Sequence, residues 1–235
     1  METNHIYQYS LVNALMAGVA GSGIKASELL KKGEQGIGTF LHVDGEMIML
    51  DGHVYQLRGD GSIRETGPEE QLPYAVATHF EAQHTLKTQL ERKDDVDNVL
   101  KKANDHAANL FMSYRIDGKF KYLKCRTVRG QEYEGQSLAE LGKKQRVEEY
   151  HDISGTIVGF LAPASWQGFF VAGEHMHFVD DGRKLGGHVL ELNTDGEVTV
   201  GIATVNNVHI ELPTNDQFNN AKMTTDDSGL KGVEG

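Results

Sequence analysis

Residues 173–192 read GEHMHFVDDGRKLGGHVLEL, and their period of two predicts a pair of strands joined by a polar turn. Alternate side chains of a strand point to the same face. His175 and His177 therefore project side by side, whereas Met176 and Phe178 project to the opposite face. This stretch predicts an antiparallel sheet with one apolar face and one face that carries imidazoles.

His188 opens the second of these strands, after the polar stretch 180–187. An antiparallel neighbour can bring its imidazole beside His175 and His177. Three convergent histidines with one open coordination position are typical of a catalytic zinc site. Imidazole also suits iron, copper and nickel, so the spacing alone leaves the metal open.

The rest of the chain predicts an α+β fold with much antiparallel or mixed sheet. The hydrophobic period predicts helices over 8–20, 26–32, 83–105 and 137–149. Strands are expected over 36–43, 46–50, 53–57, 74–80, 110–116, 119–128, 155–162, 169–179, 188–192 and 197–205. Asp117-Gly118 predicts the clearest hairpin turn in the chain.

The polar stretch 130–150 marks the expected boundary between two subdomains. Residues 1–135 would form an N-terminal subdomain of mixed α/β sheet. Residues 136–235 would form a β-rich subdomain that carries the three-histidine metal site and ends in a polar tail.

Composition narrows the function classes. A net charge of −11 argues against nucleic acid, because phosphate binding needs clustered lysine and arginine. No apolar run approaches the roughly 20 residues of a membrane span, and the N-terminus has no signal-peptide pattern. The single cysteine, Cys125, excludes an internal disulfide and favours a reducing compartment. We therefore expect a cytoplasmic protein that acts on a small molecule, away from membranes.

Three polar residues lie at strand positions that suggest a site. Glu46 follows the Asp44-Gly45 turn and alternates with apolar residues, and Thr39 lies on the preceding strand. Arg126 alternates with aromatic residues, so it either reaches solvent at a sheet edge or points into a pocket that needs a fixed cation. Each of the three is also compatible with an ordinary turn charge or a solvated sheet face.

Four blocks of sequence, in this order, together resemble the α-acetolactate decarboxylase family. They are YQYSLVNALMAG at 7–18, GIGTFLHVDGEMIMLDGHVYQL at 36–57, GTIVGF at 155–160 and HMHFVDDGRKLGGHVLE at 175–191. The similarity runs from about Tyr7 to Pro213. Agreement over separate blocks is far more specific than any one motif.

The resemblance implies decarboxylation of 2-acetolactate to acetoin through a metal-bound enediolate, in acetoin and butanediol biosynthesis. It implies Zn²⁺ as the cofactor, held by the three histidines, and a homodimer with a two-domain α/β fold. The family's active-site residues correspond to Arg126, Glu46 and Thr39, and a glutamate near the C-terminus corresponds to Glu234. Glu174 differs from the family, in which an aromatic residue is expected at this position. Strand alternation places its side chain on the face opposite the histidines.

Two other functions remain open on the residues alone. A cupin-like metal-dependent dioxygenase would use the same histidines with iron and oxygen, although its expected glutamate has no clean match near Asp181. A non-catalytic protein with a structural metal would need a fourth protein ligand. Alternation removes Glu174 from that role, which favours an open coordination position.

Overall fold

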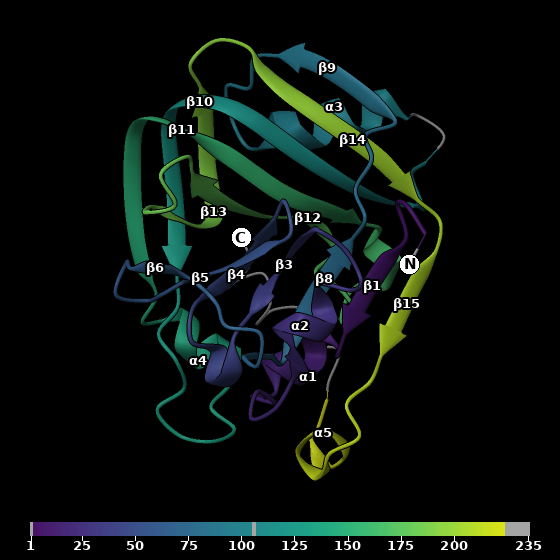
Figure 1. The fold of residues 1–235 in the computed structure, drawn as a ribbon, viewed down its shortest axis with the longest axis vertical. Helices are drawn as coiled ribbons and strands as arrows, with labels where there is room; N and C mark the ends of the chain where they lie inside the picture. Colours follow the sequence, from purple (N-terminus) through teal and green to yellow (C-terminus); the bar gives the residue numbers. More distant parts are fainter. Residues whose placement is uncertain (1, 105–106, 224–235) are drawn as a thin grey trace.

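The computed structural model describes residues 2–104 and 107–223, which fold around two large β-sheets (Figure 1). The first sheet has seven strands in the order β15-β1-β8-β3-β4-β5-β6. Their bounds are β1 Ile6–Tyr9, β3 Gln35–Thr39, β4 Glu46–Leu50, β5 His53–Leu57, β6 Ile63–Glu65, β8 Tyr74–Thr78 and β15 Val208–Glu211. All neighbours are antiparallel except β1 and β15, which are parallel.

The second sheet has six strands in the order β11-β12-β13-β10-β14-β9, with a further pairing between β10 and β11. Their bounds are β9 His84–Thr88, β10 Phe111–Thr127, β11 Arg146–Ala162, β12 Gly173–Asp180, β13 Gly186–Thr194 and β14 Val198–Val205. These four strands close on themselves, because β11 pairs with β12, β12 with β13, β13 with β10 and β10 with β11. Two short strands, β2 Ile24–Lys25 and β7 Gln71–Leu72, pair separately.

The helices are short. They are α1 Val12–Met16, α2 Ala26–Leu29, α3 Asp94–Ala103, α4 Leu138–Gly142 and α5 Asp216–Asn220, with 3₁₀ turns η1 Leu41–Val43 and η2 Ala164–Trp166. Figure 1 shows α3 beside β9 and β14, at the far end of the molecule from α1 and α4. In the part of the chain that the structure describes, no helix is long and apolar enough to span a bilayer.

Three apolar clusters correspond to the faces of the two sheets. The largest lies between the sheets and joins residues such as Ile37 and Ile48 to Val158 and Val179. Met176 and Phe178 belong to a second cluster, with Val96 and Leu100 of α3. The third lies on the other face of the seven-stranded sheet and includes Leu29 of α2. The predicted division of β12 into an apolar face and an imidazole face is therefore confirmed.

The α+β class with mostly antiparallel sheet is confirmed, but several predicted helices are shorter. Residues 8 and 9 of the expected helix over 8–20 belong instead to β1, which pairs with β8 and β15. Residues 84–88 of the expected helix over 83–105 form β9, which pairs with β14. In each case hydrogen bonds to strands distant in sequence override the local helical pattern.

The hairpin predicted at Asp117-Gly118 is wrong, because both residues lie inside the uninterrupted strand β10. Asp117 receives hydrogen bonds from Arg115 and from the hydroxyl of Thr156 on β11. A Cβ on Gly118 would lie 2.5 Å from Cγ1 of Val198. Glycine is needed here for close approach of a neighbouring strand, not for a turn.

The chain crosses between the sheets twice. Residues 6–78 supply six strands of the seven-stranded sheet, residues 84–205 supply the whole six-stranded sheet, and β15 returns to pair with β1. The strand β10 precedes residue 135 but pairs with β11, β13 and β14. The division into subdomains 1–135 and 136–235 stays a prediction.

A test of the six-stranded sheet uses Gly159, which lies opposite Tyr114 of β10 and Met176 of β12. A Cβ at this glycine would lie 2.2 Å from the ring of Tyr114, which is fully buried. We expect Gly159→Ala to lower the free energy of unfolding by about 1–3 kcal/mol through overpacking. Urea denaturation measures it. Gly67→Ala is the control, since its Cβ meets no atom closer than 3.9 Å, and equal losses in both variants would contradict this packing.

Candidate metal centre

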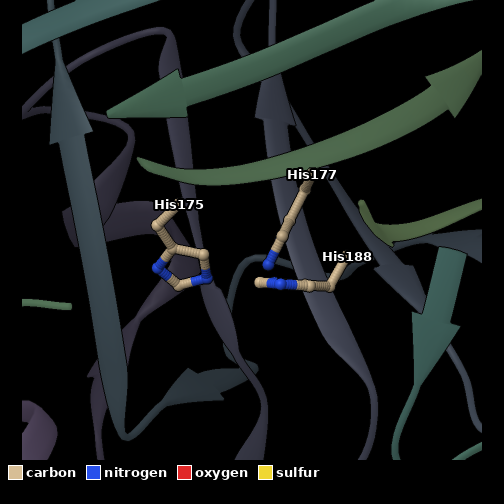
Figure 2. Close-up of side chains that lie close together, drawn as sticks. All are labelled: His175, His177 and His188. Atoms are coloured by element: carbon tan, nitrogen blue, oxygen red, sulfur yellow. The ribbon is translucent and has the colours of Figure 1, made fainter. Parts of the chain in front are cut away.

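Register within the six-stranded sheet brings the three histidines together. His177 of β12 is directly opposite His188 of β13, and His175 precedes His177 on the same face. The ring centroids lie 5.1 Å apart for His175 with each partner and 5.5 Å apart for His177 with His188. One ligand atom from each ring lies within 4.8 Å of the others. Figure 2 shows nitrogen atoms of the three rings turned toward a common centre.

The other sheet fixes the tautomer of His177. Its Nδ1 lies 2.7 Å from the main-chain oxygen of Met47 on β4. A carbonyl oxygen only accepts, so Nδ1 carries the proton and Nε2 keeps its lone pair. This Nε2 is buried and has no hydrogen-bond partner among the residues that the structure describes. A buried, oriented lone pair of this kind fits a metal ligand, with Met47 as the outer partner that sets the ring.

The histidines are held in the neutral form that binds metals. Burial lowers the pKa of His177 to about 3. The charge of Arg126 adds to this shift, and the hydrogen bond to Met47 opposes it in part. Burial, together with the neighbouring imidazoles and Arg126, also holds the pKa of His175 and of His188 well below the usual value. A metal ion therefore does not have to displace protons from these ligands at neutral pH.

A buried ion pair borders the cluster. Arg126 of β10 is directly opposite His188, and its Nη1 lies 2.8 Å from Oε1 of Glu46 on β4. The two side chains are only 2% and 8% exposed. The second carboxylate oxygen of Glu46 lies 3.6 Å from Nε2 of His177. The predicted choice for Arg126 is thus resolved: it points into a pocket and not to solvent.

Thr39 lies beside this pair, because it is the register partner of Glu46 on β3. It is 3% exposed, and its hydroxyl donates to the main-chain oxygen of Gly45 at 2.7 Å. Thr39, Glu46, Arg126 and His175 all line one small cavity between the sheets. Four of the residues expected from the sequence therefore meet at one place. Glu234 lies outside the described residues.

Glu174 lies on the opposite side of β12, as alternation predicts. Burial and the charge of Asp97 on α3 raise its pKa to about 7. It borders a second, larger cavity of about 980 Å³ that also reaches Lys93, Gly173 and Val171. Val171 lines the small cavity as well, so the two spaces share a wall. Within residues 2–104 and 107–223, no carboxylate joins the three histidines as a candidate ligand.

Sequence reasoning missed the apolar wall of the small cavity and the role of Met47. Val12 and Leu15 of α1 and Leu138 of α4 line the cavity opposite the polar residues. Their only signal in the sequence was ordinary helical spacing. Met47 acts through its main-chain oxygen, which no residue type reveals.

Fold and site together define a class of protein: a two-sheet α+β protein with a buried three-histidine cluster that fits a metal ion and an arginine–glutamate pair beside it. The profile of the family "Alpha-acetolactate decarboxylase" matches residues 6–225. The alpha-acetolactate decarboxylase of Methanosarcina mazei is 37% identical and aligns over 93% of this chain and 75% of its own length. That of Bacillus subtilis strain 168 is 36% identical over 95% of this chain and 88% of its own.

Structures agree with these sequences. The crystal structure of the Bacillus subtilis strain 168 enzyme superposes with a TM-score of 0.93, covering 98% of this chain and 99% of that one at 36% identity. The chain therefore belongs to the alpha-acetolactate decarboxylase family. This membership makes it a carboxy-lyase and confirms the resemblance seen in the sequence.

The lowered histidine pKa values predict acid sensitivity of the metal-free protein. An unfolded histidine takes up a proton near pH 6.5, whereas the buried ones stay neutral down to a much lower pH. The unfolded state thus binds more protons, and the free energy of unfolding falls as pH drops below about 6.5. Each histidine contributes up to about 1.4 kcal/mol per pH unit.

Denaturant titrations in a chelator between pH 8 and pH 5 measure this slope. We expect His188→Asn to make the slope shallower. The exposed His84 on β9 supplies the control variant, His84→Asn. An unchanged slope for His188→Asn would show that this imidazole is not held neutral by the fold.

Proposed function

We propose that this chain decarboxylates 2-acetolactate to acetoin with Zn²⁺ held by His175, His177 and His188. The observation that carries the proposal is the position of this neutral, buried cluster beside Arg126 and Glu46, in a chain of the alpha-acetolactate decarboxylase family. Three imidazoles with no fourth ligand among the described residues correspond to zinc sites that keep a position for substrate. When bound, the ion supplies a Lewis acid for the charge that develops on the substrate's ketone oxygen.

The reaction breaks the bond between the carboxylate carbon and the carbinol carbon. The electron pair stays on the substrate as carbon dioxide leaves, which gives an enediolate, and a proton then adds to carbon to give acetoin. The polar wall that would face this step is almost wholly buried, which keeps the reacting groups away from bulk water. Charge interactions are stronger in such surroundings than in water.

Arg126 supplies the fixed positive charge of the pocket. Its guanidinium would bind the carboxylate before it leaves, or order a water that delivers the proton. Arginine itself is a poor acid, since its pKa exceeds about 12. Glu46 anchors one nitrogen of the guanidinium and would orient the substrate hydroxyl or move a proton. Thr39 holds the Gly45 carbonyl and thereby the turn that leads into Glu46.

The remaining parts of the proposal rest on the family resemblance. Glu234 would join Glu46 as a second carboxylate of the site. The enzyme would act as a cytoplasmic homodimer in acetoin and butanediol biosynthesis, a setting that suits a chain with one buried cysteine.

Chelation tests the function directly. Purified protein is incubated with racemic 2-acetolactate under nitrogen, and acetoin and carbon dioxide are followed before chelation, after chelation and after Zn²⁺ is restored. We expect turnover without oxygen that chelation abolishes and Zn²⁺ restores. Turnover that needs iron and air would instead favour a dioxygenase, and turnover that survives removal of all metal would remove the ion from the mechanism.

Arg126→Ala tests the polar wall. We expect the variant to bind Zn²⁺ and to lose at least about a hundredfold in kcat/KM, because the fixed charge of the pocket is gone. Metal content and circular dichroism separate this loss from misfolding. Arg115 of the same strand is the matched control, since it forms ion pairs with Asp51 and Asp117 away from the site. Wild-type rates in Arg126→Ala would exclude this arginine from the reaction.

A further inference from the structure

The connection between β3 and β4 has an unusual backbone. His42, Val43 and Gly45 have φ of +60°, +57° and +86°. Glycine adopts such values readily, and histidine does so at times. For a β-branched residue a positive φ is a genuine outlier, and such strain persists only where the surrounding structure enforces it.

Hydrogen bonds from several directions enforce it here. The main-chain nitrogen of His42 donates to the Ala20 oxygen, and its oxygen accepts from the nitrogen of Gln131. Nε2 of Gln56 donates to the main-chain oxygen of Asp44 at 2.6 Å. Val43 is thus fixed between two clamped neighbours, in a conformation that its own side chain disfavours.

This conformation places Val43 in the wall of the small cavity. The side chain is 2% exposed and belongs to the apolar cluster between the sheets. The apolar wall also includes Val12, Leu15, Val128, Leu138 and Val171. Arg126, Glu46, Thr39 and His175 form the polar wall. The free space between the walls is about 20 Å³. That is room for about one water-sized group, and a methyl group is of similar size.

From this arrangement we infer that Val43 sets the size of the alkyl group that the site accepts. The inference rests on the proposed function, since 2-acetolactate carries its two methyl groups next to the carbons that react. One methyl would lie against Val43 while the polar end faces Arg126. The strained backbone then holds the isopropyl group of Val43 against the methyl group of the substrate. A longer alkyl group at that position would be excluded.

The test compares 2-acetolactate with its two ethyl homologues, in each of which one methyl is replaced by ethyl. Zinc-loaded wild type, Val43→Ala and Val43→Gly are assayed for kcat/KM on all three. For one of the two homologues, we expect both variants to raise its kcat/KM relative to that of 2-acetolactate by about tenfold or more. Discrimination by one methylene group is of this size. Val54→Ala is the control, because Val54 is 3% exposed but lies in the cluster on the outer face of the sheet.

A second readout does not need turnover. Calorimetry gives the dissociation constants of two inert acids, 2-hydroxy-2-methylpropanoate and 2-hydroxy-2-methylbutanoate, for the same zinc-loaded proteins. The variants should shift the preference toward the larger acid, and Val54→Ala should not.

The outcomes separate the two proposals. Suppose that wild type makes acetoin but that the Val43 variants do not raise the relative kcat/KM of either homologue. The role of Val43 is then overturned, and the proposed function stands. If wild type makes no acetoin, the proposed function fails, and the calorimetric preference decides the role of Val43 by itself. An unchanged preference, or no binding of either acid, then overturns it.

Discussion

The site depends on the way two sheets share one buried charge pair. Arg126 belongs to the six-stranded sheet and Glu46 to the seven-stranded sheet, and their contact at 2.8 Å joins the two. Removing one member of such a pair leaves an uncompensated buried charge, typically at a cost of about 3–5 kcal/mol. The hydrogen bond from His177 to Met47 crosses the same boundary. Misplacing one sheet against the other would therefore disturb the charge pair and the candidate metal ligands together.

The surroundings of this boundary explain its chemistry. Burial keeps the imidazoles neutral and leaves Nε2 of His177 with an oriented lone pair, so the fold prepares a cation site before any ion binds. The connection through Val43 and Gly45 then closes the pocket with an apolar wall. Hydrogen bonds from Gln56 and Gln131, which lie outside this connection, hold its strained backbone in place. A preorganised, buried pocket is the physical requirement for stabilising charge that exists only in the transition state.

Prediction from sequence succeeded where a pattern was local and strictly alternating. The strands 46–50 and 53–57 and the common face of His175 and His177 follow from the period of two. It failed where distant partners decided the structure. The Asp117-Gly118 dipeptide is a strong turn signal, but pairing along both edges of β10 extends the strand through it. Residues 84–88 have a helical composition, yet pairing with β14 makes them an edge strand.

The sequence by itself determined the family to which the chain belongs and indicated the residues of the candidate site, because residue type and spacing are local properties. Only the tertiary structure decided that Arg126 opposes His188 in register and reaches Glu46 on another sheet, and that Met47 orients His177 through its main chain. Register and sheet-to-sheet packing arise from contacts between segments far apart in the chain. For the same reason Val43 gave no sign of its position: a positive φ in a β-branched residue is imposed by its neighbours and not by its own preference.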